Sequence, residues 1–189
     1  MFINFWYPTI LSTELTDQPV RKTMLGLDFV VFRDSHGQAH CLSNTCVHRG
    51  GALAGGKISG DCIQCPYHGW EFTGAGECTR IPSLGPNPRI PVRTNVDAYP
   101  VVEKYGIVFA FLGDLPEDER PPMMEIPEFE SSKWRATWTN FEVPFNYERS
   151  IENGMDPAHN EFVHPSHGFS GEDAEYRIND LRWVGDGVW

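Results

Sequence analysis

The chain has 189 residues, enough for one or two domains that each bury a core. Hydrophobic residues make up 40% and aromatic residues 13% of it, which excludes an intrinsically disordered chain. The formal net charge is −11, and this negative charge disfavours binding to the phosphates of a nucleic acid.

Residues 20–112 are predicted to form short antiparallel strands separated by turns. Residues 23–32 read as one strand, a turn at 34–37 follows, and residues 38–43 read as the returning strand. Two further turns are predicted at 59–61 and 73–76. Residues 101–102 and 106–112 form the last predicted strand pair. Short strands at close spacing indicate a small sandwich or barrel.

Two segments in this region have the composition of metal-binding loops. The first contains Cys46 and His48, the second contains Cys65 and His68, and 16 residues separate His48 from Cys65. Thiolates suit an iron that stays ferric, while imidazoles bring less negative charge and raise a cluster's potential. Neighbouring glycines allow backbone N–H groups to approach the sulfides. The alternatives are a structural zinc site with the same ligands, or buried cysteines beside surface histidines.

The remaining cysteines indicate packing rather than chemistry. Cys41, Cys62 and Cys78 lie in or beside predicted strands, where a free thiol behaves as a small hydrophobic side chain. An odd cysteine count also disfavours a disulfide framework.

Residues 115–127 contain four prolines and a run of acidic residues, which is typical of a linker. Beyond it, residues 133–141 are predicted as a strand, 146–155 as a helix and 176–189 as strands. The predicted organisation is one domain over residues 1–115 and the start of another over 116–189.

A second group of candidate ligands follows the predicted helix. His159 and His164 are five residues apart, about 140° around a regular helix, so the helix must end or deform near His164. Pro165 provides the cause, because the residue before a proline is pushed towards extended geometry. Asp156 has two readings that can coexist: an N-cap with Pro157 at the first helical position, and a carboxylate that accepts from the second ring nitrogen of His159.

The pattern C-x-H-x16-C-x-x-H, with Cys-Pro-Tyr-His-Gly-Trp as its second loop, resembles the Rieske domain of ring-hydroxylating oxygenases. The opening Phe-Trp-Tyr-Pro at residues 5–8 and residues 62–72 are similar to that family too. The resemblance implies a [2Fe–2S] cluster with Cys46 and Cys65 on the inner iron and His48 and His68 on the outer iron.

The segment E-N-x-x-D-x-x-H-x4-H resembles the mononuclear iron site of the same oxygenases. The resemblance implies that His159 and His164 bind Fe(II), that Asn153 lies close to this iron, and that Asp156 bridges to a cluster histidine of a neighbouring subunit. In this family an acidic third ligand comes from a later helix. The expectation is therefore an incomplete α+β catalytic domain after a mainly β Rieske domain, with Fe(II) weakly held or absent in this chain.

These features predict the terminal oxygenase component of a Rieske system, which hydroxylates or O-demethylates an aromatic or similar apolar substrate with O2. The resemblance implies an NADH-dependent reductase or ferredoxin as electron donor and a homotrimer. The alternatives are a Rieske ferredoxin that only transfers electrons, which leaves residues 116–189 unexplained, and a catalytically incomplete fragment. With no apolar run that could cross a bilayer and no signal peptide in the sequence, the expected location is the cytoplasm, without a membrane or nucleic-acid partner.

Overall fold

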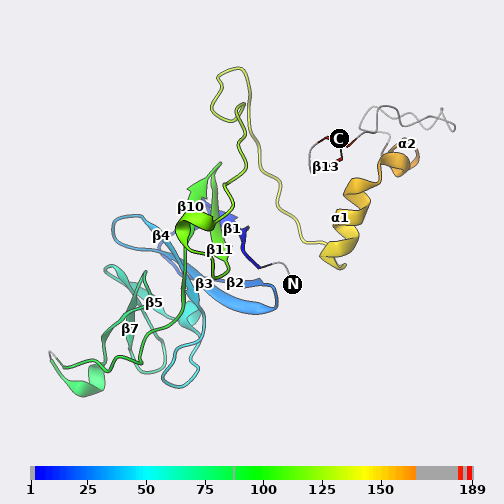
Figure 1. Ribbon diagram of the computed structural model, residues 1–189. Coiled ribbons are helices and arrows are strands. Elements are labelled where there is room, and N and C mark those ends of the chain that lie inside the picture. Colours follow the sequence, from blue (N-terminus) through cyan, green and yellow to red (C-terminus); the bar gives the residue numbers. More distant parts are fainter. Residues whose placement is uncertain (1–2, 87, 165–182, 185–186, 189) are drawn as a thin grey trace. The chain divides into compact units, whose positions relative to one another are not determined.

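The computed structural model describes residues 3–86, 88–164, 183–184 and 187–188. The chain divides into two compact units, Met1–Arg135 and Ala136–Trp189. The first unit consists of antiparallel β-sheets, drawn from blue to green in Figure 1, and the second contains the helices α1 and α2. The predicted mainly β fold with few helices is confirmed.

A four-stranded antiparallel sheet lies at the centre of the first unit. Its order is β2-β3-β4-β9, and the strands are Val20–Met24, Leu27–Arg33, Ala39–Ser43 and Ala98–Tyr99. The expected single strand over residues 23–32 is wrong, because the chain turns at Leu25 and Gly26. Both residues have positive φ, 52° and 75°, which is the geometry of a tight hairpin turn.

Strand β3 is buried on both faces, and this explains its continuous apolar sequence. Val30 and Phe32 contribute to one core, and Phe29 and Val31 contribute to another. Alternate residues of a strand point to opposite faces, so a strand between two layers needs apolar residues at every position. The central sheet therefore separates two hydrophobic cores.

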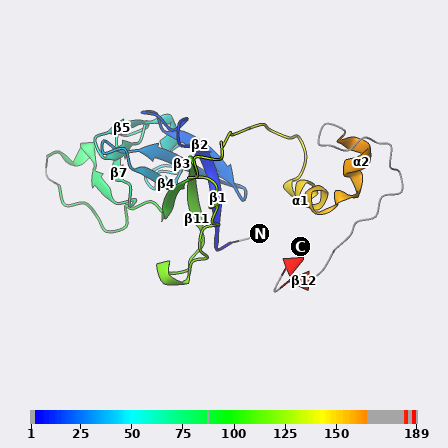
Figure 2. The same cartoon turned by 90° about the horizontal axis from the view of Figure 1, so that it is seen from above.

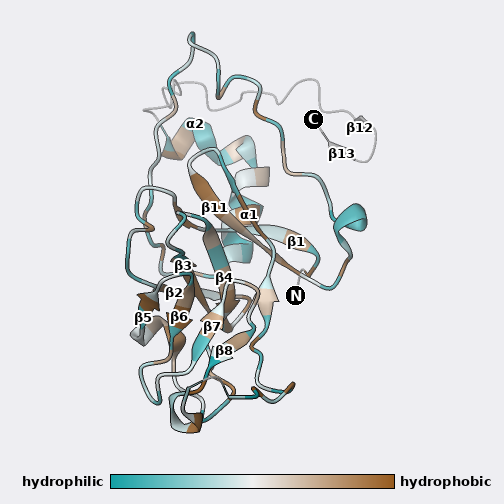
Figure 3. Ribbon diagram, turned by 90° about the vertical axis from the view of Figure 1, so that its left-hand side faces the viewer, coloured by the Kyte–Doolittle hydropathy of each residue, from teal (hydrophilic) through white to brown (hydrophobic). Residues whose placement is uncertain are grey.

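The core around Phe29 and Val31 is closed by a three-stranded sheet. Its order is β1-β11-β10, and the strands are Phe5–Leu11, Ile107–Leu112 and Val101–Lys104. The hairpin of β10 and β11 was predicted, and much of β11 is coloured as hydrophobic in Figure 3. Strand β1 was not predicted, because its partner β11 lies about a hundred residues further along the chain.

The core around Val30 and Phe32 is closed by a second four-stranded sheet; the second Cys/His loop joins two of its strands, β6 and β7, and the first loop precedes the sheet. Its order is β5-β6-β7-β8, and the strands are Lys57–Ser59, Cys62–Gln64, Glu71–Thr73 and Cys78–Arg80. The turns predicted at residues 59–61 and 73–76 join these strands. Figures 1 and 2 both show β5 and β7 beside β3 and β4.

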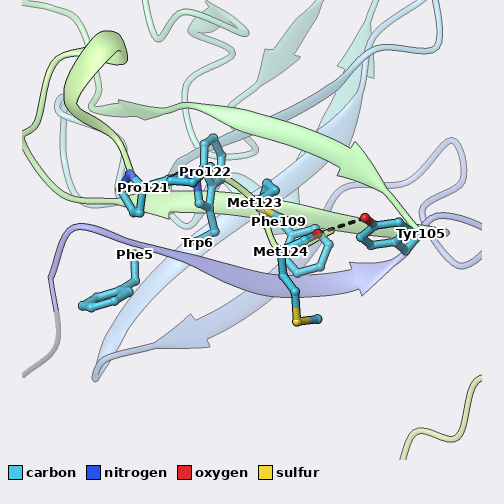
Figure 4. A pocket seen from close by; sticks show the side chains of 8 residues that line it. All are labelled: Phe5, Trp6, Tyr105, Phe109, Pro121, Pro122, Met123 and Met124. Atoms are coloured by element: carbon cyan, nitrogen blue, oxygen red, sulfur yellow. Dashed lines mark hydrogen bonds between the residues drawn. The ribbon is translucent and has the colours of Figure 1, made fainter. Parts of the chain in front are cut away.

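The proline-rich segment after β11 packs on the β1-β11-β10 sheet. Trp6 Nε1 donates to the carbonyl of Pro121 at 2.8 Å, and Tyr105 Oη donates to that of Met124 at 2.9 Å. Figure 4 shows these residues around an apolar cavity of about 240 Å³. The structure thus places residues 116–135 in the first compact unit, and the domain boundary expected after residue 115 stays a prediction.

The second unit contains the predicted helix, whereas the strand predicted across the boundary of the two units is absent. Residues 133–141 form no strand, and most of them are exposed with no strand pairing among the described residues. Isolated extended backbone leaves its N–H and C=O groups to water, so a strand needs a partner. Helix α1 spans Tyr147–Met155, and the Asn146 side chain caps it by accepting from Glu148 N.

A short 3-10 helix η4, Pro157–His159, and helix α2, Asn160–Val163, follow α1. Of the strands expected over 176–189, β12 (Trp183–Val184) pairs with β13 (Gly187–Val188), and the other residues of this range lie outside the described part. No helix among the described residues is long and apolar enough to span a membrane.

Candidate metal centres

The two Cys/His loops have the same backbone hydrogen bonds. In the first loop, Cys46 N donates to Gly51 O at 2.9 Å. In the second, Cys65 N donates to Trp70 O at 2.7 Å, which is again a bond to the fifth residue after the cysteine. The two loops thus hold their cysteines in one type of turn.

Each loop also depends on a glycine with positive φ. Gly50 and Gly69 both have φ of 70°, and their N–H groups donate to the carbonyls of Cys46 and Cys65 at 2.9 and 3.1 Å. A residue with a Cβ atom is strained in this conformation. The glycines noted in the sequence therefore close the loops, each four residues after its cysteine.

The thiols of the two loops lie together in the interior. Cys46 and Cys65 are each 2% exposed. Burial raises the pKa of the Cys46 thiol to about 11, with a smaller contribution from the neighbouring Cys65, while the N–H groups of His48 and Arg49 act in the opposite direction. Those N–H groups point at the Cys46 sulfur and would stabilise a thiolate bound to a metal.

The imidazoles of the two loops form a second pair at the surface. The ring centroids of His48 and His68 are 4.4 Å apart, with an angle of 68° between the rings. Loss of hydration lowers the pKa of His48, and the charges of His68 and Arg49 lower it further. A lower pKa favours the neutral imidazole, the form that binds metals.

The four side chains fit a cluster with two kinds of iron. They form a buried thiol pair and an exposed imidazole pair, as a [2Fe–2S] cluster with two cysteines on one iron and two histidines on the other requires. Among the described residues, no group of three or more Cys, His, Asp or Glu side chains is placed to share a single ion.

The second site begins at Asp156, which ends α1 and starts η4. Its Oδ1 accepts from Ala158 N at 3.0 Å, so the predicted N-cap role with Pro157 at the first helical position is confirmed. The second expected role is not seen, because the His159 ring contacts the main-chain carbonyl of Asp156 rather than its carboxylate. The main-chain carbonyl of Asp156 lies 2.6 Å from His159 Nδ1, so this nitrogen donates the hydrogen bond and the lone pair of Nε2 is left available for a metal.

His159 and His164 lie together although they are five residues apart. Helix α2 ends at Val163, and His164 has φ of −121° and ψ of 60°, so the predicted end of the helix at His164 is confirmed. The two ring centroids are 5.1 Å apart. A cavity of about 480 Å³ adjoins both rings. Its lining consists of Phe145, Arg149, Ser150, Asn153, His159, Val163 and His164.

Arg149 and Ser150 line this cavity and were not predicted from the sequence. Arg149 is one helical turn before Asn153, so the i, i+4 spacing on α1 could have indicated it. Of the cysteines expected to pack internally, Cys41 and Cys78 are buried, whereas Cys62 is only half-buried.

Residues 5–103 match the family model of the Rieske [2Fe-2S] domain, so the chain belongs to the Rieske family of iron–sulfur proteins. Among curated proteins, it is 39% identical to chlorophyllide a oxygenase of Chlamydomonas reinhardtii over 86% of this chain and 24% of that protein. It is 32% identical to the iron-sulfur subunit TsaM1 of the toluene-4-sulfonate monooxygenase system of Comamonas testosteroni, over 88% of this chain and 48% of that protein.

Solved structures of Rieske oxygenases have the same fold. Dicamba monooxygenase bound to dicamba matches with a TM-score of 0.76 and 30% identity, over 86% of this chain and 48% of that one. NdmA of Pseudomonas putida CBB5 matches with a TM-score of 0.77 and 28% identity, over 93% of this chain and 54% of that one. The chain therefore spans about half, or less, of the length of these relatives.

Proposed function

We propose that this chain provides the cluster-bearing part of a terminal Rieske oxygenase, an oxidoreductase that incorporates oxygen from O2. The observation that carries the proposal is the pairing of two buried thiols and two exposed imidazoles on loops with matching backbones. Cys46 and Cys65 hold the inner iron of a [2Fe–2S] cluster, and His48 and His68 hold the outer one. The exposed histidines are the side of the site that an electron-transfer partner can approach.

His159 and His164 are proposed to bind a mononuclear Fe(II) through Nε2 of His159 and a ring nitrogen of His164. The bond from His159 Nδ1 to the Asp156 carbonyl fixes the tautomer that such binding needs. When bound, the cluster supplies single electrons, and an Fe(II) held by two histidines and a carboxylate supplies O2 activation. The two histidines alone leave Fe(II) without a carboxylate ligand, so we expect weak Fe(II) binding in this chain.

The histidine pair favours an oxygenase over a ferredoxin that only transfers electrons. A ferredoxin has no use for a second metal site, yet His159 and His164 adjoin a cavity of about 480 Å³. Relatives such as the toluene-4-sulfonate monooxygenase subunit and 3-chlorobenzoate-3,4-dioxygenase are oxygenase components. We infer a small aromatic or apolar substrate, an NADH-dependent reductase or ferredoxin as donor, and a homotrimer in which Asp156 bridges to a cluster histidine of the next subunit.

The test is to purify the chain and measure iron, acid-labile sulfide and the EPR spectrum after reduction. We expect two irons and two sulfides per chain. Cys65→Ser should abolish this loading, whereas Cys62→Ser, a change of the half-buried cysteine outside the loops, should leave it intact. Zinc without sulfide in the purified chain would disprove the cluster assignment.

A second measurement addresses the mononuclear site. Fe(II) titration of the cluster-loaded chain should show one additional weak site that His159→Ala removes, while the cluster content stays unchanged. Retention of that site in His159→Ala would place the second iron elsewhere.

A further inference from the structure

The two imidazoles of the cluster site have different surroundings. The indole ring of Trp70 lies parallel to the ring of His48, with 4.6 Å between the ring centroids and 6° between the ring planes. His68 instead meets Tyr67 at 4.0 Å and 38°, and Tyr67 is 64% exposed. One histidine is therefore stacked on a flat aromatic surface from the other loop, whereas the second meets, besides His48, a tilted and exposed ring from its own loop.

This asymmetry follows from one position in the two matching loops. Trp70 is the fifth residue after Cys65, and Gly51 is the fifth residue after Cys46. A Cβ atom at Gly51 would lie 3.1 Å from Cys65 Sγ and 3.3 Å from Tyr67 Cβ. A side chain at this position of the first loop would press against Cys65 Sγ and Tyr67, whereas the second loop places a ring across the cluster site.

Trp70 is itself held firmly from two sides. Its carbonyl accepts from Cys65 N at 2.7 Å, which fixes its backbone to a proposed cluster ligand. Its ring also packs, partly buried, against the core that includes Phe72, Ile63 and Cys46. A side chain fixed at its backbone and against the core can in turn restrict the ring that stacks on it.

We propose that Trp70 is a positioning residue that sets the rotation of the His48 ring and covers one face of it, an inference that rests on the proposed role of His48 as a cluster ligand. Parallel stacking opposes rotation of the imidazole about its Cβ–Cγ bond. The direction of the lone pair that binds iron is thereby fixed, as an outer hydrogen bond fixes it in many metal sites. Trp70 thus acts on the cluster through His48 and joins the two loops without binding metal.

The experiment compares the wild-type chain with Trp70→Leu, Trp70→Phe and the control Tyr67→Leu, each loaded with the cluster. Removing an outer partner of a metal ligand typically weakens metal binding about ten- to a hundredfold, so Trp70→Leu should lose its cluster to a chelator at least about tenfold faster. The g-values of its reduced EPR spectrum should also shift. Trp70→Phe keeps a ring, so its rate of cluster loss and its g-values should lie between those of the wild type and Trp70→Leu. Tyr67→Leu should resemble the wild type in both measurements.

The EPR spectrum separates positioning from ordinary packing. If Trp70 only fills space, the surviving cluster in Trp70→Leu or Trp70→Phe will have the wild-type g-values although the protein unfolds at a lower temperature, and the inference is wrong. Should Trp70→Leu not fold, the g-values of Trp70→Phe decide in the same way. A wild-type chain without a cluster would instead refute the proposed function itself.

Discussion

At the scale of single residues, the absence of a Cβ atom at Gly51 allows the two cluster loops to approach each other closely. The Cβ that Gly51 lacks would lie 3.1 Å from Cys65 Sγ, closer than ordinary van der Waals contact. Gly55 lies a few residues away, and its added Cβ would meet only Pro66 Cγ at 3.7 Å. These two glycines therefore provide a matched pair of substitutions.

We predict that Gly51→Ala destabilises the chain by about 1–3 kcal/mol, the usual cost of overpacking, and reduces its iron and sulfide content. Gly55→Ala should change neither quantity by much. Thermal unfolding and metal analysis of the two variants provide the measurement. Full cluster loading and an unchanged melting temperature in Gly51→Ala would show that the loops tolerate a wider separation.

Asp156 combines a structural contact with its proposed bridging role, and two substitutions separate them. Asparagine also caps helices, so Asp156→Asn should keep the bond to Ala158 N and the metal loading, whereas Asp156→Ala loses the cap at a cost of about 1 kcal/mol. In the assembled oxygenase we expect Asp156→Asn to slow NADH-coupled turnover about ten- to a hundredfold. If turnover falls in Asp156→Ala but not in Asp156→Asn, the residue acts only as a helix cap.

At the scale of elements, one ion pair connects strands of two sheets. The guanidinium of Arg33 on β3 forms two bonds with Glu103 on β10, at 2.7 and 2.9 Å. Arg33 also donates to the carbonyls of Leu15 and Ser12, which precede β2. The hydrogen bond from Arg33 lowers the pKa of Glu103, although partial burial opposes this.

The lowered pKa of Glu103 predicts how stability depends on pH. The folded-state pKa lies below the unfolded value, so the contribution of the pair is present above the unfolded pKa of about 4.3 and is lost as the pH falls through the folded value. Solvent screens this pair, because the Glu103 side chain is 38% exposed, and we expect about 1 kcal/mol or less.

The measurement is the melting temperature between pH 3 and 7 for the wild type, Glu103→Gln and the exposed control Glu14→Gln. Glu103→Gln should lower the melting temperature at pH 7 and flatten its fall in acid. Parallel curves for Glu103→Gln and the wild type would show that other carboxylates cause the acid sensitivity.

At the scale of the whole molecule, the compact unit that carries the cluster loops extends to Arg135. The segment after β11 contributes the bond from Trp6 to Pro121, the bond from Ile126 N to Tyr105 Oη, and the ion pair of Lys104 with Glu125. These contacts cover the outer face of the β1-β11-β10 sheet. A chain cut after residue 115 loses all of them.

We predict that a fragment of residues 1–135 melts at a higher temperature than one of residues 1–115, by several degrees, because it retains the two hydrogen bonds and the ion pair just described, together with the Tyr105–Met124 bond. Both fragments should bind the cluster, since its four proposed ligands lie within residues 46–68. Equal melting temperatures would support a domain boundary directly after residue 115.

The features that the sequence predicted are local ones. They depend on bonds between residues that are near neighbours in the chain. Examples are a glycine with positive φ, a capping side chain and a pair of ligands a few residues apart. The turn at residues 34–37, the cap at Asp156 and the end of the helix at His164 therefore follow from the sequence, although the unmarked turn at Leu25 and Gly26 did not. The composition of the two Cys/His loops was likewise sufficient to indicate the family.

The features that only the tertiary structure decided depend on distant partners. Strand β1 exists because β11 pairs with it, whereas residues 133–141 have a strand-like sequence and no strand partner in the described part of the chain. The stacking of Trp70 on His48 joins two different loops, and the distance between these loops in space cannot be read from their spacing in the sequence. Sequence by itself determines which groups can bind metal, but the packing of remote segments determines which rings and backbones surround them, because these contacts form only when the sheets come together.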